Sequence, residues 1–260
     1  MLAPAEVDAC ANLLAQAYSS NTWFADFPVD TSSLSVAEAA NIQNKAASLI
    51  GADVIGWKVG YANEAKRREH GESAPVWGRL FEGAVLSSPA VLKRADVGNP
   101  IVEGEWVVRL GEDLPARDVP YTSEEITGAI GAVMPAIEFA DPRLSRPFSV
   151  VELLAINAGA FRVLLGPEVP NWQQANINEL DAELIMDGEC HATAYHDDQR
   201  SDPVWSLRHL ANLASRRGVG LSAGQVVSTG VILPLFRLGS GQDIEFRVAG
   251  LDAVKLSVRD

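Results

Sequence analysis

Apolar residues with helical spacing dominate the first part of the chain. The segments APAEVDACANLLAQAY (3–18) and SVAEAANIQNKAASLIG (35–51) both repeat apolar positions every three or four residues. Ser35 is suited to cap the second helix, and Gly51 directly follows it. The pattern predicts a helical N-terminal segment over residues 1–50.

Short apolar runs bounded by turn residues follow, and they predict strands. The strand candidates are VIGWKVGY (54–61), IVEGEWVVRL (101–110) and VMPAIEFAD (133–141), with β-structure or loop in AVLSSPAVLKRADV (84–97). DAELIMDGECHATAY (181–195) is typical of a hairpin that turns at Asp187–Gly188. Residues 225–258 alternate like antiparallel strands.

Three helices are expected among these strands. TSEEITGAIGAV (122–133) starts with a capping box, and SVVELLAINAGAFRVLLG (149–166) combines a helix with a small-residue turn. PVWSLRHLANLASRRG (203–218) is amphipathic and is expected to end at Gly218. The order of elements favours the α+β class, with residues 51–260 as a β-rich domain that forms one compact unit with the N-terminal segment.

Composition indicates the cellular compartment and the kinds of binding partner. The 260 residues include 21 Lys+Arg and 34 Asp+Glu, a net charge of −13, which argues against nucleic acid or an anionic membrane surface as partner. Cys10 and Cys190 form no motif, as expected in a reducing compartment. The N-terminus lacks the basic start of a signal peptide, and no apolar run reaches the roughly 18 residues of a membrane span. We expect a soluble, cytoplasmic protein.

Two glutamates share one face of the strand predicted at 101–110. Glu103 and Glu105 are two residues apart, and alternate residues of a strand point to the same side. Both can simply face solvent on a half-exposed sheet. Against this interpretation, a third acid, Glu138, lies inside another apolar strand, and burying three unpaired carboxylates is costly. A hard divalent cation, Mg²⁺ or Mn²⁺, would compensate them. The histidines show no zinc-site spacing; they are His70, His191, His196 and His209.

Several motifs, in this order and spacing, resemble one enzyme family. They are GWKVG, PIVEGEWVVRLGEDLP, VMPAIEFADPR, INAGAFRVLLG, DPVWSLRHLANLASRRGVGLSAGQVVSTG and GLDAVKLSV. From about residue 35 to its end, the chain resembles the 2-keto-4-pentenoate hydratase and 4-oxalocrotonate decarboxylase family of the fumarylacetoacetate hydrolase superfamily. The resemblance implies a fumarylacetoacetase C-terminal-like mixed β-structure with helices packed around it. It also implies that residues 51–260 are catalytic and that the protein is a homo-oligomer.

The resemblance assigns roles to individual positions. Glu103, Glu105 and Glu138 match the metal ligands, which implies Mg²⁺ or Mn²⁺. Lys58 matches a lysine near the substrate, and a lowered pKa would let it move a proton. Asp141 is the second catalytic candidate. The substrate-binding candidates are Asn157, Arg79, Arg162, Ser228 and Thr229.

Each of these positions also has a purely structural interpretation. Lys58 can be a surface lysine, Asp141 can cap the end of a strand, and Asn157 can close the small-residue turn. A β-turn accounts for Ser228 and Thr229, and the arginines, Arg143 included, can be surface or ion-pair residues.

Departures from the family pattern bear on the reaction. Ala62 and Asn63 stand where hydratases of the family have Thr-Ser, and Val76 stands where they have an acid. Gly159 and Ala160 replace common serines. Without the acid that would hold water, we expect a metal-dependent lyase that forms a metal-stabilised enolate of a small unsaturated 2-oxo acid from aromatic catabolism, most like 2-oxo-3-hexenedioate (4-oxalocrotonate) decarboxylase.

Three alternatives remain open at this point. One is a 2-keto-4-pentenoate hydratase. Another is an acylpyruvate C–C hydrolase, which needs a His–Glu pair such as His70 with Glu69 in a polar helix. A non-enzymatic alternative is an assembly partner in a hydratase–decarboxylase complex, although intact metal ligands argue against a purely structural role.

Overall fold

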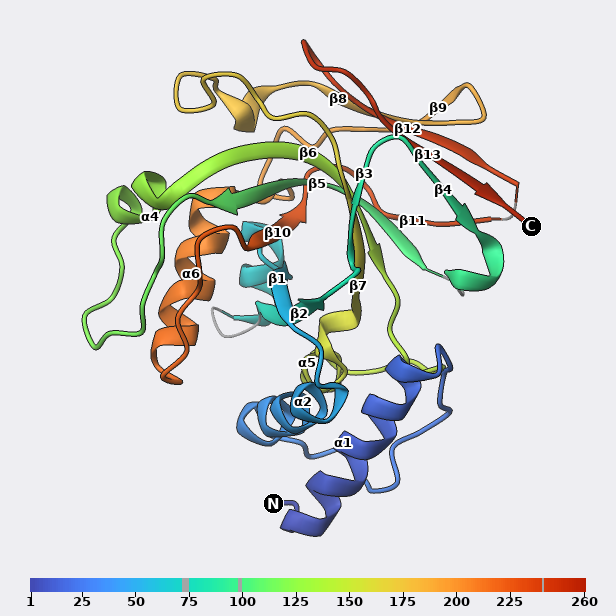
Figure 1. Ribbon diagram of the computed structural model, residues 1–260, viewed down its shortest axis with the longest axis vertical. Helices are drawn as coiled ribbons and strands as arrows, with labels where there is room; N and C mark the ends of the chain where they lie inside the picture. The colour runs from blue at the N-terminus through green and yellow to red at the C-terminus, as the bar shows by residue number, and fades with distance from the viewer. Residues whose placement is uncertain (72–74, 98–99, 240) are drawn as a thin grey trace.

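Two β-sheets with helices around them form the molecule (Figure 1). The computed structural model describes residues 1–71, 75–97, 100–239 and 241–260. Within these ranges the helices are α1 Pro4–Ser19, α2 Val36–Ile50, α3 Glu64–His70, α4 Ser123–Ala129, α5 Val150–Ala155 and α6 Pro203–Ser215, with 3₁₀ turns η1 Arg94–Asp96, η2 Asn157–Gly159 and η3 Ile177–Glu179. No helix in the described part of the chain is long and apolar enough to cross a membrane.

The larger sheet has eight strands and curls on itself. Its order is β2–β1–β10–β5–β6–β7–β3, with β11 paired to β5. The strands are β1 Val54–Gly60, β2 Val76–Phe81, β3 Val85–Ser87, β5 Ile101–Leu110, β6 Ile130–Ala140, β7 Ala160–Leu165, β10 Val226–Val231 and β11 Phe236–Arg237. Although β2 and β7 lie near opposite ends of this order, they contact each other. The sheet therefore wraps around an interior face.

The smaller sheet has five strands in the order β4–β13–β12–β8–β9. They are β4 Ala90–Lys93, β8 Ala182–Met186, β9 Glu189–Thr193, β12 Asp243–Val248 and β13 Val254–Arg259. Strands β12 and β13 contact β6, so this sheet covers the outer side of the larger one. Asp187 and Gly188 connect β8 to β9 with φ angles of 49° and 86°, as a type I′ hairpin turn requires. The predicted hairpin is confirmed.

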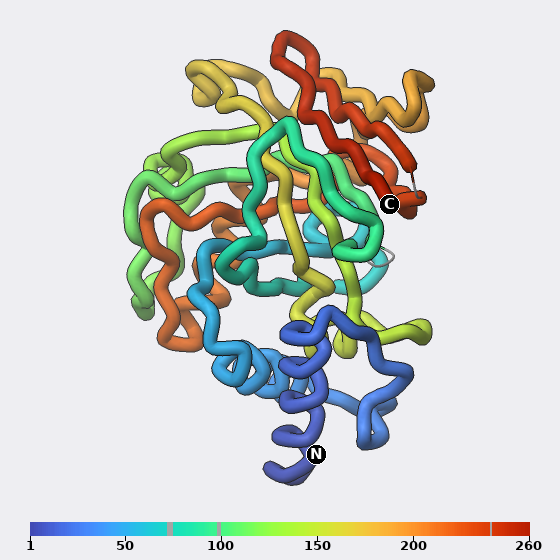
Figure 2. The backbone as a smooth tube through the Cα atoms, turned by 45° about the vertical axis from the view of Figure 1, so that its right-hand side comes forward, coloured from blue at the N-terminus to red at the C-terminus, as the bar shows by residue number. Residues whose placement is uncertain are grey.

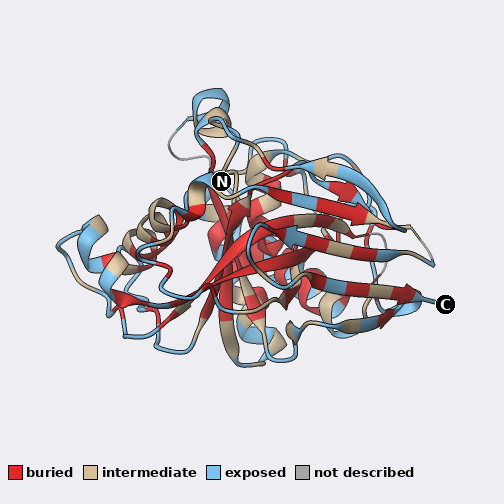
Figure 3. Cartoon of the chain, turned by 90° about the horizontal axis from the view of Figure 1, so that it is seen from above, coloured by how far each residue is buried: buried red, intermediate tan, exposed pale blue. Residues whose placement is uncertain are grey.

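Apolar residues occupy both faces of the larger sheet, as Figure 3 shows by the buried stretches along the strands. One cluster fills part of the interior face and includes Leu80, Val107, Met134 and Val226. The more extensive cluster lies on the outer face and continues into the helices. Because alternate residues of a strand point to opposite faces, each strand supplies both clusters.

The N-terminal helices pack at one end of the molecule, opposite the C-terminal strands (Figure 2). Helix α2 contacts both α1 and α5. The Ser35 hydroxyl caps α2 by accepting from the backbone N–H of Glu38, and Gly51 ends the helix with φ 68°. These boundaries confirm the predicted helices. The division into residues 1–50 and 51–260 stays a prediction.

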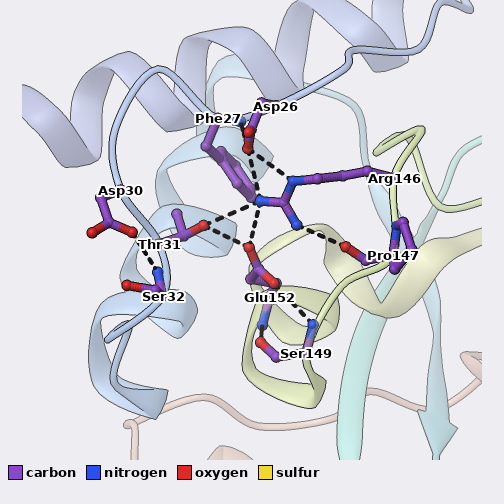
Figure 4. A network of polar contacts seen from close by, with 9 residues as sticks. All are labelled: Asp26, Phe27, Asp30, Thr31, Ser32, Arg146, Pro147, Ser149 and Glu152. Atoms are coloured by element: carbon purple, nitrogen blue, oxygen red, sulfur yellow. Dashed lines mark hydrogen bonds and ion pairs between the residues drawn. The ribbon is translucent and has the colours of Figure 1, made fainter.

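A polar network holds the loop between α1 and α2 against α5 (Figure 4). The Arg146 guanidinium lies 2.7 Å from both Asp26 Oδ1 and Glu152 Oε1, and the Thr31 hydroxyl donates to Glu152 at 2.5 Å. Although burial opposes it, the hydrogen bonds from Arg146, Thr31 and the Ser149 backbone lower the pKa of Glu152 to about 2. The network therefore contributes stability that depends on an ionised Glu152.

The α+β class and the mixed β-structure are confirmed, with several local differences. Strand β7 occupies part of the segment expected as a helix and a turn, and β6 begins at Ile130, inside the helix expected over 122–133. Helix α6 ends at Ser215, and Gly218 follows in a turn with φ 70°. The C-terminal strands are not all antiparallel, because β10 pairs in parallel with β1, and β13 pairs in parallel with β4. Both parallel pairs join segments far apart in sequence, so local alternation could not predict them.

Candidate metal centre

Three glutamates gather on the interior face of the larger sheet. Glu103 and Glu105 lie two residues apart on β5, and Glu138 on β6 is the direct cross-strand partner of Glu103. One carboxylate oxygen from each lies within 4.8 Å of the other two. The side chains of Glu105 and Glu138 are fully buried, whereas Glu103 is 13% exposed. The three acids therefore form a cluster of negative charge in which Glu103 alone is partly exposed to solvent.

Lys58 brings a positive charge to the same face from β1. Its Nζ lies 2.8 Å from Glu138 Oε1 and 3.9 Å from Glu103 Oε2, and its side chain is 5% exposed. Burial opposes the ammonium, but the charges of Glu103, Glu138 and Glu105 outweigh burial and raise the pKa of Lys58. Without a bound cation, the charge of the carboxylates dominates over desolvation and raises the pKa; the lowered pKa expected for Lys58 beside a cation stays a prediction.

Strand β10 completes the cluster with hydrogen-bond donors. The Ser228 hydroxyl contacts Glu105 Oε2 and lies 3.0 Å from Glu138 Oε2, while the backbone N–H of Gly230 donates to Glu105 Oε2 at 3.0 Å. The next residue, Thr229, points the other way, and its hydroxyl donates to the Trp106 carbonyl at 2.6 Å. The structure thus brings Ser228 into the site and leaves Thr229 outside it.

The arrangement fits a divalent cation. Burial and the charges of Glu138 and Glu103 raise the pKa of Glu105 well above its usual value, and burial raises the pKa of Glu138 despite Lys58. Glu105 Oε1 is buried and has no hydrogen-bond partner among the described residues. A hard cation such as Mg²⁺, Mn²⁺ or Ca²⁺ prefers carboxylate oxygens and would satisfy this atom. Glu103, Glu105 and Glu138 are the residues that would hold it.

The two arginines favoured as substrate ligands lie on the outer face of the sheet. Arg79 on β2 pairs with Trp57, and its guanidinium donates to Gln43 and Asn44 of α2 at 2.7 and 2.6 Å. Arg162 on β7 pairs with Phe139, whereas its neighbour in the chain pairs with Glu138. Because alternate residues face opposite sides, neither arginine shares the face of Glu138.

Asn157 and Asp141 make structural contacts between the larger sheet and the N-terminal segment. Asn157 has φ 60°, and its side chain accepts from the Arg79 backbone N–H at 2.7 Å and donates to the Tyr18 hydroxyl at 3.2 Å. Asp141 accepts from the Trp23 indole at 2.8 Å and lies 3.5 Å from Arg143. Both side chains therefore fasten β-strands to the α1 segment, and Asp141 is outside the glutamate cluster.

Sequence reasoning missed Arg237 and Tyr18. Arg237 on β11 pairs with Ile101, which is on the same face of β5 as Glu103. It lines a cavity of about 540 Å³ together with Ile101, Trp23 and Asp141. Burial raises the pKa of Tyr18 to about 12, and the charge of Lys58 also reaches this phenol. No local signal marks either residue, because both reach this region through long-range packing.

Comparison with known proteins supports an enzymatic site. The chain is 28% identical over 210 residues to a 4-oxalocrotonate decarboxylase of Pseudomonas sp, covering 80% of this chain and 79% of the relative. It is 25% identical to a 2-keto-4-pentenoate hydratase of Paraburkholderia phymatum, and the match covers 83% of this chain and 82% of the hydratase. No family model matches the chain.

Solved structures give the same picture of the fold. The 4-oxalocrotonate decarboxylase of Pseudomonas putida G7, complexed with magnesium and adipate, superposes with a TM-score of 0.88 at 23% identity over 99% of both chains. A fumarylpyruvate hydrolase from Pseudomonas aeruginosa, in complex with Mn²⁺ and pyruvate, superposes with a TM-score of 0.53 at 21% identity. The superposition covers 78% of this chain and 88% of the hydrolase.

The chain therefore has the fold of the fumarylacetoacetate hydrolase family. Within that class it is a homologue of 4-oxalocrotonate decarboxylases and 2-keto-4-pentenoate hydratases, as the sequence motifs indicate. The cluster of Glu103, Glu105 and Glu138 is the candidate site for a divalent metal.

Proposed function

We propose that this protein is a divalent-metal-dependent lyase that removes CO₂ from 2-oxo-3-hexenedioate. The observation that carries the proposal is the cluster of Glu103, Glu105 and Glu138 beside Lys58, on a fold shared with a decarboxylase that binds magnesium and adipate. Adipate is a six-carbon diacid, as is the proposed substrate. Decarboxylase and hydratase relatives both act on small 2-oxo acids.

The three glutamates would hold Mg²⁺ or Mn²⁺. When bound, the cation would supply a Lewis acid that polarises the carbonyl of a 2-oxo acid. In the decarboxylation, the bond to the distal carboxylate breaks, and its electron pair moves along the conjugated chain to the carbonyl oxygen. One proton added to that oxygen gives 2-hydroxypenta-2,4-dienoate and CO₂. Lys58 lies on the same face, with its Nζ 2.8 Å from Glu138 Oε1, and its ammonium group would donate this proton.

Arg237 is the arginine best placed for the distal carboxylate. It lines the cavity beside Ile101, on the face of Glu103, and no carboxylate of the described residues pairs with it. Arg79 and Arg162 are on the other face and are no longer candidates for this role. Asp141 borders the same cavity and, through Trp23 and Arg143, would position its wall rather than transfer a proton.

Hydration is the second candidate, because several relatives are hydratases. Their substrate, 2-hydroxypenta-2,4-dienoate, would be the product of the decarboxylation. Val76 argues against hydration, since it pairs with Gly60 on the face of Lys58, where the family pattern places an acid. The hydrolase alternative lacks support: the pair Glu69–His70 is 3.2 Å apart on the short helix α3, and the side chain of Glu69 is 55% exposed.

Product analysis by NMR distinguishes these reactions. The wild-type protein and Glu103→Ala are each given 2-oxo-3-hexenedioate or 2-hydroxypenta-2,4-dienoate, with Mg²⁺ or with chelator. The proposal expects Mg²⁺-dependent loss of CO₂ from the diacid by the wild type alone. Water addition to the dienoate without decarboxylation would overturn it in favour of the hydratase. Metal binding without turnover of either would keep the metal site and exclude both substrates, whereas the absence of metal binding would favour the assembly role.

The remaining proposals concern the cellular location and the assembly of the protein. We expect a cytoplasmic homo-oligomer, associated with a partner enzyme of the same pathway. Size-exclusion chromatography with light scattering, alone and with a cognate hydratase, would measure both kinds of assembly.

A further inference from the structure

A second cavity lies on the outer face of the larger sheet, on the other side of β1 and β2 from the glutamates. Its volume is about 390 Å³, and it is bounded by α2 and α6, which flank these strands in Figure 1. Trp57 and Arg79 form a cross-strand pair on this face, while Lys58 points to the interior. The cavity is therefore separate from the metal centre, although both use strand β1.

Two tryptophans and two arginines dominate this cavity. The Arg79 guanidinium lies 5.2 Å from the ring centre of Trp57, and the Arg217 guanidinium lies 4.4 Å from that of Trp77. The Trp57 indole N–H donates to Gln225 Oε1 at 3.1 Å, which fixes the orientation of the ring. Both indoles are largely buried, at 5% and 6% exposed, so packing holds them in place and only their edges border the cavity, with a cation beside each ring.

Neither guanidinium has a carboxylate partner among the described residues. Arg79 donates to the neutral amides of Gln43 and Asn44, and Arg217 donates to the backbone carbonyl of Leu213 at 3.2 Å. No Asp or Glu lines the cavity. Burial and the positive charge of Arg217 both lower the pKa of Arg79. Two unpaired cations at one cavity, in a chain of net charge −13, favour an anion.

We propose that this cavity binds a small aromatic carboxylate. Its carboxylate would bridge Arg79 and Arg217, and its ring would lie against Trp57 and Trp77. Charge-assisted, bidentate bonds from guanidinium groups suit a carboxylate, and the apolar walls suit a planar ring. The volume falls within the range of about 300–1,000 Å³ that is common for small-molecule sites. Because it depends on other residues, this site is independent of the proposed lyase activity.

Benzoate titration by calorimetry tests the proposal, with chelator present so that no divalent cation holds the carboxylate elsewhere. The wild type is compared with Arg79→Gln and Arg217→Gln. Arg216→Gln is the matched control, because it removes the same charge from the neighbouring residue, which lines a different cavity. We expect one benzoate per chain for wild type and control, with binding at least about tenfold weaker in the other two variants. Benzamide, which is uncharged, should bind similarly weakly.

Two results would overturn the site. One is equal benzoate affinity in all four proteins, or no saturable binding to the wild type. The other is benzoate binding by the wild type only when Mg²⁺ is added in place of chelator, which would place benzoate at the glutamates. Arg79 also bonds to α2, whereas Arg217 is in the exposed turn after α6, so loss of binding in Arg79→Gln with full binding in Arg217→Gln would also overturn the site.

Discussion

Glu103 and Glu138 lie directly opposite each other on β5 and β6, in the position where like charges destabilise a sheet. Lys58 contacts both, but three carboxylates around one ammonium leave the cluster negative. The fold therefore keeps an arrangement that is unfavourable without a cation. Such an electrostatic cost at clustered carboxylates is typical of functional sites, which agrees with the proposed metal site.

Removing the charge of Glu105 should abolish metal binding without lowering the stability of the metal-free protein. In Glu105→Gln, Ser228 and Gly230 can still donate to the amide oxygen, while repulsion by Glu138 disappears. With chelator present, we expect the free energy of unfolding to stay equal or rise by about 1 kcal/mol. Added Mg²⁺ should raise the melting temperature of the wild type but not that of the variant. Thermal unfolding with and without Mg²⁺ measures both effects, and an equal Mg²⁺-dependent rise in the two proteins would contradict the assignment.

Lys58→Met should be harmful to both stability and turnover. It leaves Glu138 without its partner at 2.8 Å, and breaking one side of a buried ion pair costs about 3–5 kcal/mol. Loss of a proton donor should lower kcat by about 10²–10⁴-fold. Urea unfolding and steady-state kinetics measure these changes. Lys66→Met serves as control, since its pair with Glu69 is exposed and should be worth less than about 1 kcal/mol.

Arg237→Gln should affect the diacid selectively. If Arg237 binds the distal carboxylate, its loss should raise KM for 2-oxo-3-hexenedioate by about tenfold or more. Binding of oxalate, which has no distal group to reach Arg237, should stay unchanged. Arg162→Gln is the control from the outer face of the sheet. Steady-state kinetics measure KM, and inhibition by oxalate measures oxalate binding. If Arg237→Gln and Arg162→Gln changed KM equally, Arg237 would not be a substrate ligand.

The Arg146 network makes a pH-dependent contribution to stability. The folded-state pKa of Glu152, about 2, is below the usual value near 4.5, so ionised Glu152 stabilises the folded chain above pH 4.5. The contribution is lost as pH falls from about 4.5 towards 2. Glu152→Gln should lower the free energy of unfolding by about 1–3 kcal/mol at neutral pH, with a smaller deficit in acid. Urea unfolding across this pH range would contradict the account if the deficit were constant.

Local pattern predicted most of the helices, strand β5 and the shared face of two glutamates, but it missed strands β2 and β7. Strand β5 has the predicted limits, Ile101 and Leu110, and alternation correctly placed Glu103 and Glu105 on one face. Alternation also implies that Ser228 and Thr229 cannot both face the site, a constraint that assigning both to the pocket overlooked.

Long-range pairing decided what the sequence could not show. The face occupied by Arg79 depends on the register of β2 against β1, and Arg237 reaches the site only because β11 pairs with β5. Lys58 illustrates a second limit. Its pKa results from opposing effects of burial and of three carboxylates, so its direction requires knowing how close those carboxylates lie.

Direct measurement of Mn²⁺ binding tests the metal centre itself. Mn²⁺ bound to the chain can be counted by electron paramagnetic resonance for the wild type, Glu103→Gln and Glu138→Gln, with Glu69→Gln as an exposed control. The account predicts one bound Mn²⁺ per chain in the wild type and the control, displaced by Mg²⁺, and greatly weakened binding in the other two variants. Unchanged binding in either would contradict the central claim that these glutamates hold the metal.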